Sequence, residues 1–480
     1  MPHAGGFGRI ASIALWAAAI VAIGLAIALP EPELLALGAI GVAGVVITLV
    51  QPLAALPLLL FAVPFGSLGR TSTGDSTTEL SFGGAEVVVA LLSATWLARG
   101  VRLRTINLRP GAVVIAILAM TAMAMLSIGY ANDKSLAVKE SLKWLELLLA
   151  VLILVDLATT PNAARWVIGA MFIAGSAEAL YGAYQFFTDA GPNFFQLAGA
   201  LRAFGHFDQP NPFAGYLTII LPLAVCMALC RANPVAFRWL SVAAAGALVV
   251  GIGLSQSRGA WLGGAVAGVC LMLLWNRTTR MLLVPAGLFA ALGTAMAFTG
   301  LLPASITDRL SQTIEYFGVF DVRTVEVSPD NWAIVERMAH WQAGWYMFLD
   351  HPWLGVGAGN YPDAYPAYFV GQWLEPLGHA HNYYLNMLAE LGVIGGGLLL
   401  LLLGLAFREL LGAMLHSERG SAGFWRAVLA GSIGGLIVFC VHNLFDSLFV
   451  HSVNVQVGVL LGLGLIAGDQ LRRERRLVRL

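Results

Sequence analysis

Long apolar runs separated by short polar breaks make up most of this chain. Runs of about 17–25 residues match the thickness of the hydrocarbon core of a bilayer. Because a backbone in that medium must satisfy its own hydrogen bonds, each run predicts a helix and not an open strand. The pattern predicts fourteen membrane helices, of which the third and fourth are short for a span, near 10–29, 34–50, 52–65, 85–98, 111–128, 138–157, 163–187, 211–230, 236–254, 259–275, 280–302, 381–406, 427–444 and 453–468.

Composition supports the same fold class. The 480 residues are 58% hydrophobic and 11% charged, whereas a soluble domain carries about 25% charged residues. We therefore expect an all-α integral membrane protein, a polytopic bundle of about 12–14 transmembrane helices with one large extracytoplasmic loop that itself contains helices. The chain divides into N-terminal membrane helices, a second group of membrane helices, the large loop, and C-terminal membrane helices with a basic tail, at 1–200, 201–302, 303–380 and 381–480.

The distribution of Lys and Arg predicts the orientation, because these residues concentrate in cytoplasmic loops. Numbering the helices alternately places 18 of the 27 basic residues on one side, together with only five acids. Both termini are then cytoplasmic, and the large loop is extracytoplasmic. The basic residues of the cytoplasmic side are Arg9, Arg99, Arg102, Arg104, Arg109, Arg165, Arg231, Arg238, Arg277, Arg280, Arg408, Arg419, Arg426, Arg472, Arg473, Arg475, Arg476 and Arg479.

The segment 303–380 is the one long non-apolar stretch, and it mixes aromatic with charged residues. A structureless loop of this length would be unusual, and long loops that persist usually bind or catalyse. Trp341, Trp345 and Phe348 beside Arg337 have the spacing of an amphipathic helix near the membrane interface. Such an aromatic stripe is more often an interfacial anchor than a ligand site.

Ionisable groups close to a membrane span are costly, so each one is a functional hypothesis. Ser255, Gln256, Ser257 and Arg258 are the polar residues between two apolar runs, which predicts a tight turn at the outer surface. Arg258 then either snorkels to lipid headgroups or faces a protein cavity. A guanidinium in a partly dry cavity suits a phosphate or diphosphate, because its planar fork pairs with two oxygens at once.

Arg337 follows Glu336, and a surface ion pair is the default interpretation of such neighbours. Further along, Gly355, Gly357 and Gly359 alternate in a way that superficially resembles a nucleotide-binding loop. The spacing is not GxGxxG, and no strand is expected before it. A tight turn that lets backbone approach closely is the better interpretation.

His379 and His381 lie at the outer mouth of the helix that we expect to start near 381. A histidine exchanges a proton near neutral pH and is the usual general base. Two histidines at i and i+2 cannot face the same way on a helix, and a zinc pair prefers i, i+4 spacing or more acidic neighbours. We therefore expect no metal here, but one catalytic or substrate-orienting histidine and one structural histidine.

Weaker polar signals lie on the same side, and for each a structural role is at least an equal alternative. They are the loop residues Arg202, His206, Asp208 and Asn211, the helical group Lys139, Glu140, Lys143 and Glu146, and the late-loop group His442, Asp446 and His451. The four cysteines lie inside apolar runs without metal-ligand spacing, and we interpret them as small buried hydrophobes: Cys226, Cys230, Cys270 and Cys440.

The order and spacing of these residues resemble the O-antigen ligase and Wzy-type polymerase superfamily. His381-Asn382, nine residues, and then Gly392-Val393-Ile394-Gly395 is similar to a pattern typical of O-antigen ligases. The matching fragments together span about 205–395 and also include Gly205–Asn211, Ser257-Arg258-Gly259, Arg337-x-x-x-Trp341 and Pro352–Asn360. Fourteen helices exceed the number that the resemblance implies, so the first helices are an added or wrongly divided portion.

The resemblance implies an enzyme of the bacterial inner membrane that moves a glycan from undecaprenyl diphosphate to an acceptor hydroxyl on the periplasmic face. For a ligase the acceptor is lipid A–core, and for a polymerase it is another lipid-linked repeat. His381 would be the catalytic base, and Arg258 and Arg337 would bind the diphosphate, where cationic donors stabilise developing charge. Possible supporting residues are His379, Asn382, Ser257, Trp341, Arg202, His206, Asn211, Lys139 and Lys143.

Direct displacement at the anomeric carbon would invert its configuration, and the diphosphate already activates the donor. We therefore expect no cofactor, no metal and no nucleic-acid partner; the expected partners are the lipid-linked glycan, the acceptor glycan and the bilayer. Two other functions stay open. A transporter of a small anion or glycan would need ionisable groups near the bilayer midplane, for which Glu178 is the best case because Asp156 lies by the cytoplasmic end. The second open function is that of a scaffold subunit in a polysaccharide export system.

Overall fold

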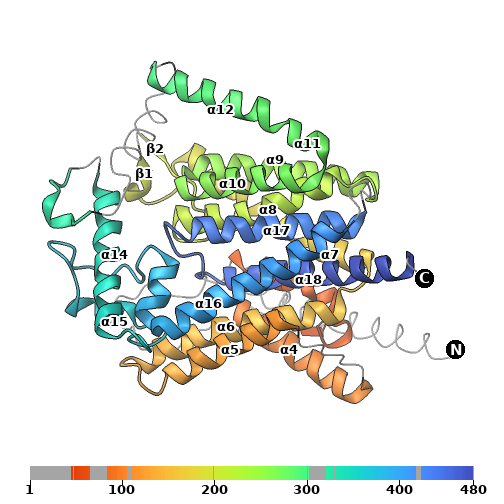
Figure 1. The fold of residues 1–480 in the computed structure, drawn as a ribbon, viewed down its shortest axis with the longest axis horizontal. Coiled ribbons are helices and arrows are strands. Elements are labelled where there is room, and N and C mark those ends of the chain that lie inside the picture. Colours follow the sequence, from red (N-terminus) through yellow and green to blue (C-terminus); the bar gives the residue numbers. More distant parts are fainter. Residues whose placement is uncertain are drawn as a thin grey trace, which may run out of the picture.

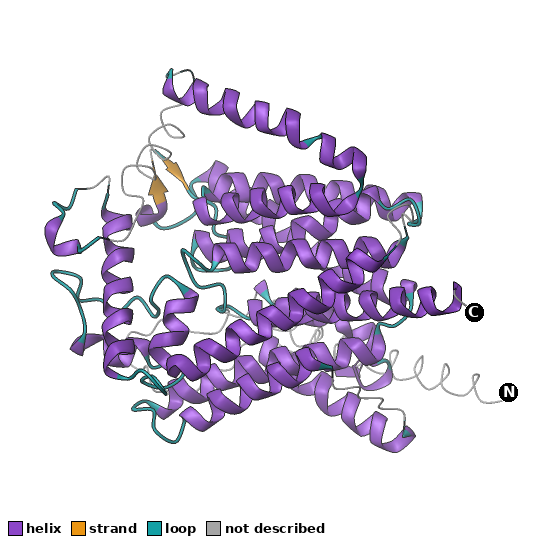
Figure 2. Ribbon diagram, viewed as in Figure 1, coloured by secondary structure: helices purple, strands orange, loops and turns teal. Residues whose placement is uncertain are grey.

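The computed structural model describes residues 45–64, 84–104, 111–299, 301, 320–417 and 423–478, apart from 47, 198, 329 and 330. Nearly all regular structure in this part of the chain is helical (Figure 2), and one short antiparallel pair joins β1 (Gln196–Leu197) to β2 (Ala200–Leu201). The all-α prediction is therefore confirmed. The expected helix 10–29 and most of 34–50 lie outside the described residues.

Each predicted helix from 52–65 onward corresponds to helical structure. The longer helices are α3 (Pro52–Ala62), α4 (Gly84–Leu103), α5 (Ala112–Ser127), α6 (Lys134–Leu157), α7 (Pro161–Thr188), α8 (Pro210–Leu229), α9 (Val235–Ser255), α10 (Arg258–Trp275), α12 (Leu283–Phe298), α14 (Trp332–Asp350), α16 (Tyr383–His416), α17 (Phe424–His442) and α18 (Val453–Val478). Short helices are η2 (Asn193–Phe195), α11 (Arg277–Met281), η3 (Val322–Thr324), α15 (Tyr361–Ala364) and η4 (Tyr365–Ala367).

The length and composition of these helices suit a multi-pass membrane protein. Among the described residues, eight helical segments are long and apolar enough to cross a membrane, namely α7, α8, α9, α10, the α11–α12 segment, α16, α17 and α18. The helices α3 and α5 are apolar but shorter.

Several boundaries differ from the sequence prediction because polar residues extend helices. Asp133 accepts hydrogen bonds from the backbone N–H groups of Ser135 and Leu136, so α6 begins at Lys134 and not near 138. The helix α4 continues through its arginines to Leu103, so it has 20 residues and is not short. The helix predicted to start near 381 begins at Tyr383, because Asn382 caps α16.

The long helices run side by side, and α14 crosses one end of the bundle (Figure 1). This end, called the site end below, carries the connections 128–133, 189–209, 256–257 and 443–452 together with residues 320–382. The C-terminal helix ends at the opposite end. There lie the described arginines that the sequence assigns to the cytoplasm, which include Arg102, Arg165, Arg231, Arg277, Arg426 and Arg473.

Small residues let α8 and α17 pack closely, as is usual between membrane helices. A Cβ atom at Gly431 would lie 2.6 Å from the Cα of Leu223, and one at Gly435 would lie 2.7 Å from the carbonyl oxygen of Ile219. The close approach of these two helices brings the start of α8 beside the loop that follows α17.

The glycine-rich segment 352–359 packs against a break in the backbone of α16. Gly392 has φ +62°, and a Cβ there would lie 2.3 Å from the backbone of Trp353. The N–H of Val393 donates to the Pro352 carbonyl at 2.8 Å, and the N–H of Gly357 donates to the Glu390 carbonyl at 2.8 Å. These bonds satisfy backbone groups that the break frees. The close-approach interpretation of the glycine run is confirmed.

Candidate functional site

His381 lies in the loop ahead of α16, and contacts of its own backbone and of its neighbour fix its position. Its φ is +51°, a conformation that only a well-supported residue adopts. The indole N–H of Trp341 donates to the His381 carbonyl at 3.2 Å. Asn382 accepts from the N–H of Leu385 at 3.1 Å and so caps the helix that follows. Trp341 and Asn382 therefore position His381, although Trp341 belongs to the stripe interpreted as an interfacial anchor.

Both histidines lie close to the carboxylate of Asp446, which is in the loop between α17 and α18. Its Oδ1 lies 3.3 Å from His381 Nδ1 and 3.8 Å from His379 Nε2. The expectation that the two histidines face apart was wrong, because both precede the first residue of α16 and are not helical. The N–H of Ser447 donates to the same oxygen at 2.9 Å, and Asn211 Nδ2 donates to Oδ2 at 2.7 Å.

Asp446 is ionised over the whole physiological range. Burial alone would raise the pKa of its carboxyl, but the hydrogen bond from His381 and the charge of Arg337 outweigh burial and hold that pKa well below its usual range. An ionised carboxylate only accepts hydrogen bonds, so His381 donates to it from Nδ1. The uncharged form of this ring has its lone pair on Nε2, which is buried and has no hydrogen-bond partner among the described residues. This is the form of a general base.

His379 has the opposite arrangement. Its Nδ1 accepts from the backbone N–H of His381 at 3.1 Å, so its proton is on Nε2. Burial, followed by the charge of His381, lowers the pKa of His379 to about 3. The neutral ring therefore has no lone pair left for a substrate proton.

A chain of hydrogen bonds fixes Asp446 through its second carboxylate oxygen, Oδ2. Arg202 donates from Nη2 to the side-chain oxygen of Asn211 at 3.0 Å and from Nε to the Ser255 carbonyl at 2.9 Å. Asn211 donates in turn to Asp446. The loop before α8 and the turn before α10 are thereby tied to the aspartate.

Arg258 and Arg337 come together beside this pair. Arg258 is the first residue of α10, and it interacts electrostatically with Arg337 of α14. Arg337 also acts on the charge of Asp446, and its buried Nε has no hydrogen-bond partner within the described chain. A Cβ at Gly259 would lie 3.2 Å from the His442 ring, so Gly259 lets this helix start approach α17. Both guanidinium groups are partly buried, which favours a cavity-facing role for Arg258 over snorkelling.

His206 has a structural partner. His206 Nδ1 lies 2.7 Å from Glu178 Oε1, and the His206 backbone N–H donates to the same carboxylate. Glu178 therefore anchors the loop before α8, which weakens the case for a transport site. Ser257 is buried at the turn before α10.

The two lysines of α6 do not join the arginines. Lys143 contacts Glu140 Oε2 at 2.6 Å and the Phe449 carbonyl at 3.2 Å. With Lys139 it lines a separate cavity that reaches His379.

Sequence reasoning gave too little weight to Asp446 and overlooked His340. Asp446 was one of several late-loop polar groups, and its isolation between two apolar runs was the available signal. His340, on α14, is buried with its ring centroid 5.5 Å from that of His381. Burial, then the charge of His381, lowers the pKa of His340 to about 3.

The same side chains include the one set in the described residues that could hold a metal ion. His379, His381 and Asp446 each offer a ligand atom, and these atoms lie within 4.8 Å of one another. His379 Nδ1 already accepts a hydrogen bond from the His381 N–H, so the ring proton is on Nε2. A protonated Nε2 cannot bind a metal. The observed hydrogen bonds fit a base and its orienting carboxylate better than a ligand set.

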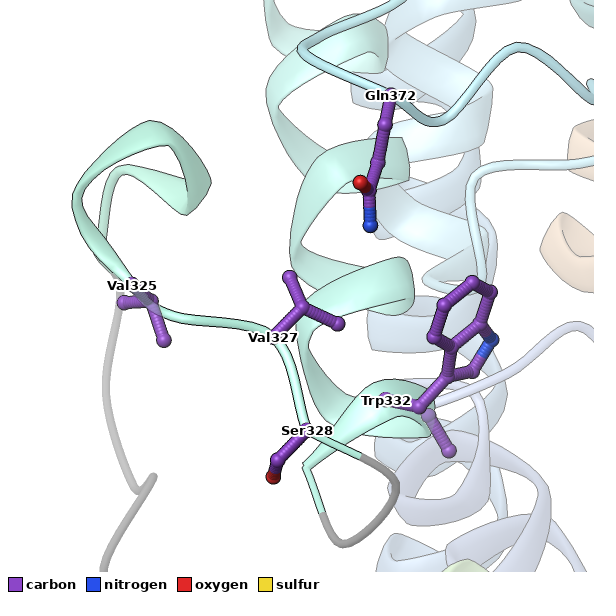
Figure 3. A pocket seen from close by; sticks show the side chains of 6 residues that line it. Val325, Val327, Ser328, Trp332 and Gln372 are labelled. Carbon is purple, nitrogen blue, oxygen red and sulfur yellow. The ribbon is translucent and has the colours of Figure 1, made fainter.

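A hollow larger than the cavity beside His379 lies elsewhere at the site end (Figure 3). Its volume is about 800 Å³, and it is lined by Val325, Val327, Ser328, Trp332, Ala333 and Gln372. None of these described lining residues is ionisable, so this hollow lacks the groups that proton transfer or diphosphate binding needs.

Comparison with known proteins bears on this site directly. Residues 243–400 match the Wzy_C family model, described as O-antigen ligase. This match confirms the resemblance, and the matched segment contains Arg258, Arg337 and His381. Asp446 and Asn211 lie outside it. No curated protein matched the chain.

Proposed function

We propose that this protein transfers a glycan from undecaprenyl diphosphate to an acceptor hydroxyl, with lipid A–core as the acceptor. The observation that carries the proposal is the His381–Asp446 pair. It leaves the lone pair of the uncharged ring on the buried Nε2 of His381, while Arg337 acts on the charge of Asp446 and interacts in turn with Arg258. The match to the O-antigen ligase family model supports the reaction class.

Each part of the site has a role in this reaction. His381 takes the proton from the acceptor hydroxyl as its oxygen bonds to the anomeric carbon. The bond from that carbon to the diphosphate breaks, and Arg258 and Arg337 stabilise the charge on the departing lipid diphosphate. Asp446 holds the tautomer and stabilises the imidazolium that forms. Displacement in one step inverts the anomeric configuration.

We place the site end at the periplasmic face of the inner membrane and both termini in the cytoplasm. The arginines gathered at the opposite end support this orientation. The donor lipid then presents its diphosphate at the level of the two arginines.

The test is transfer by the purified full chain, given an undecaprenyl-diphosphate glycan and lipid A–core without ATP. We expect a lipid A–core product of inverted linkage, formed equally well after EDTA treatment. A lipid-linked repeat offered as a competing acceptor separates the polymerase alternative. Preferential elongation of that repeat would reassign the protein as a polymerase, and the absence of transfer to either acceptor would reject the proposal.

A further inference from the structure

A polar cavity lies next to His379, beside the α6 helix. It has a volume of about 350 Å³, and a neighbouring hollow of about 250 Å³ shares Glu86, Lys143, Glu146 and His379 with it. We call the two together the α6 cavity. Ligand pockets commonly have volumes of about 300–1,000 Å³. Neither arginine of the proposed diphosphate site lines it.

The charges in the α6 cavity disfavour a phosphate. The larger part is lined by the two amines of Lys139 and Lys143 and by four carboxylates, from Glu86, Glu140, Glu146 and Glu390. Lys143 is already paired with Glu140 at 2.6 Å. Three acids remain against two amines even when the buried Glu390 is left out, and His379 is neutral, so an anion would meet net repulsion here.

Two buried polar atoms at the cavity have no hydrogen-bond partner among the described residues. Tyr383 is 2% exposed and its hydroxyl is unpartnered, while Asn454 is 0% exposed and its Oδ1 is unpartnered. Tyr383 lines the larger part, and Asn454 lines the smaller. A buried polar atom without a partner costs free energy, so such atoms mark places where a polar ligand would bind.

We propose that the α6 cavity binds the sugar of the acceptor and selects an uncharged or amine-bearing sugar over a phosphorylated one. This assignment rests on the proposed glycan transfer. Carboxylates accept hydrogen bonds from sugar hydroxyls, the lysines and Tyr383 donate to them, and Phe449 provides an apolar wall. The cavity ends at His379, whose ring centroid is 4.4 Å from that of His381, so a sugar held there lies close to the base.

The kinetic test is Tyr383→Phe, which removes a hydroxyl that no described residue hydrogen-bonds. We expect the acceptor KM to rise roughly three- to tenfold, the effect of one hydrogen bond, with the donor KM unchanged. The matched control is Tyr184→Phe, because Tyr184 is 57% exposed on α7. An unchanged acceptor KM, or an equal rise in both constants, would overturn the assignment.

A binding test needs no transfer activity. Saturation-transfer NMR on the full chain in detergent would use methyl glucoside, methyl glucosaminide and glucose 6-phosphate as probes. We expect signals from the first two, weakened in Tyr383→Phe and in Glu140→Gln, and none from the phosphate ester. Equal signals from glucose 6-phosphate, or no signal from any probe, would reject the sugar site. Sugar binding without transfer to any acceptor would instead reject the proposed function and leave the sugar site in place.

Discussion

At the residue scale, the two histidines ahead of α16 differ in which ring nitrogen is engaged. His381 donates from Nδ1 and keeps a lone pair on Nε2, whereas His379 uses its lone pair to accept from a backbone N–H. The difference follows from the ionised carboxylate of Asp446, which fixes the tautomer of His381. Two residues of the same type therefore have different chemical capacities.

Asparagine substitutions separate these capacities. His379→Asn can still accept from the His381 N–H through its side-chain oxygen, so we expect transfer within about threefold of the original. His381→Asn removes the base, and we expect a loss of about 10²–10⁴-fold in kcat. Both rates are measured in the transfer assay, with membrane insertion checked in parallel. Equal losses in the two variants would remove the distinction.

Arg258→Lys tests the diphosphate assignment. An ammonium lacks the planar fork of a guanidinium, so we expect a loss of roughly 10²-fold in transfer and weaker donor binding. The control is Arg408→Lys, because Arg408 is exposed at the opposite end. Normal donor affinity in Arg258→Lys would return Arg258 to a snorkelling role.

The buried histidines predict a stability that depends on pH. In the folded protein the pKa of both His379 and His340 is lowered from 6.5 to about 3. The unfolded chain then binds more protons between these values, so stability is lost as pH falls below about 6.5 and is unaffected by these groups above it. We expect a lower thermal midpoint at pH 5 than at pH 7.5, with a smaller drop in His379→Asn. An equal drop in the thermal midpoint of the original protein and of His379→Asn would show that the burial of His379 is not the cause.

At the element scale, the break in α16 couples the glycine-rich segment to the histidine loop. The helix bends where Gly392 has a positive φ, and residues 352–359 bond to the backbone groups on both sides of the bend. The first turns of α16, which follow His381 directly, are thus oriented by a segment of the large loop. The glycines of the sequence motif let the backbone of this segment pack closely.

Gly392→Ala tests this role. The new Cβ would lie 2.3 Å from backbone atoms of Trp353 and would also strain a positive φ, at a cost of about 1–3 kcal/mol for the strain alone. We expect a lower thermal midpoint together with reduced transfer. Gly397→Ala on the same helix is the matched control, since nothing lies within 4 Å of its added Cβ. Equal stability of the two variants would show that the break is not required.

At the scale of the whole molecule, the two ends of the bundle have different chemistry. The site end gathers the histidines, Asp446 and two partly buried arginines, and the opposite end gathers many arginines, most of them exposed. This asymmetry suits a donor whose diphosphate lies at one membrane surface.

Cysteine labelling in intact cells tests the orientation. Leu374 is 60% exposed at the site end, and Leu477 is 73% exposed near the C-terminus. In a variant without the four native cysteines, we expect Leu374→Cys to react with an impermeant maleimide in intact spheroplasts. Leu477→Cys should react only after permeabilisation. The reverse pattern would place the site in the cytoplasm and end the proposal.

The sequence by itself determined the helices and the candidate groups, because both follow from local properties. Apolar runs of bilayer length fold as helices wherever they stand, and Arg258, Arg337 and His381 stood out because charge near a span is costly. Only the tertiary structure decided how these groups work. Asp446 meets His381 across 65 residues and Asn211 across 235, and no local pattern encodes such pairs. The tautomer of each histidine depends on those contacts, so the proposal of His381 as the base rests on packing.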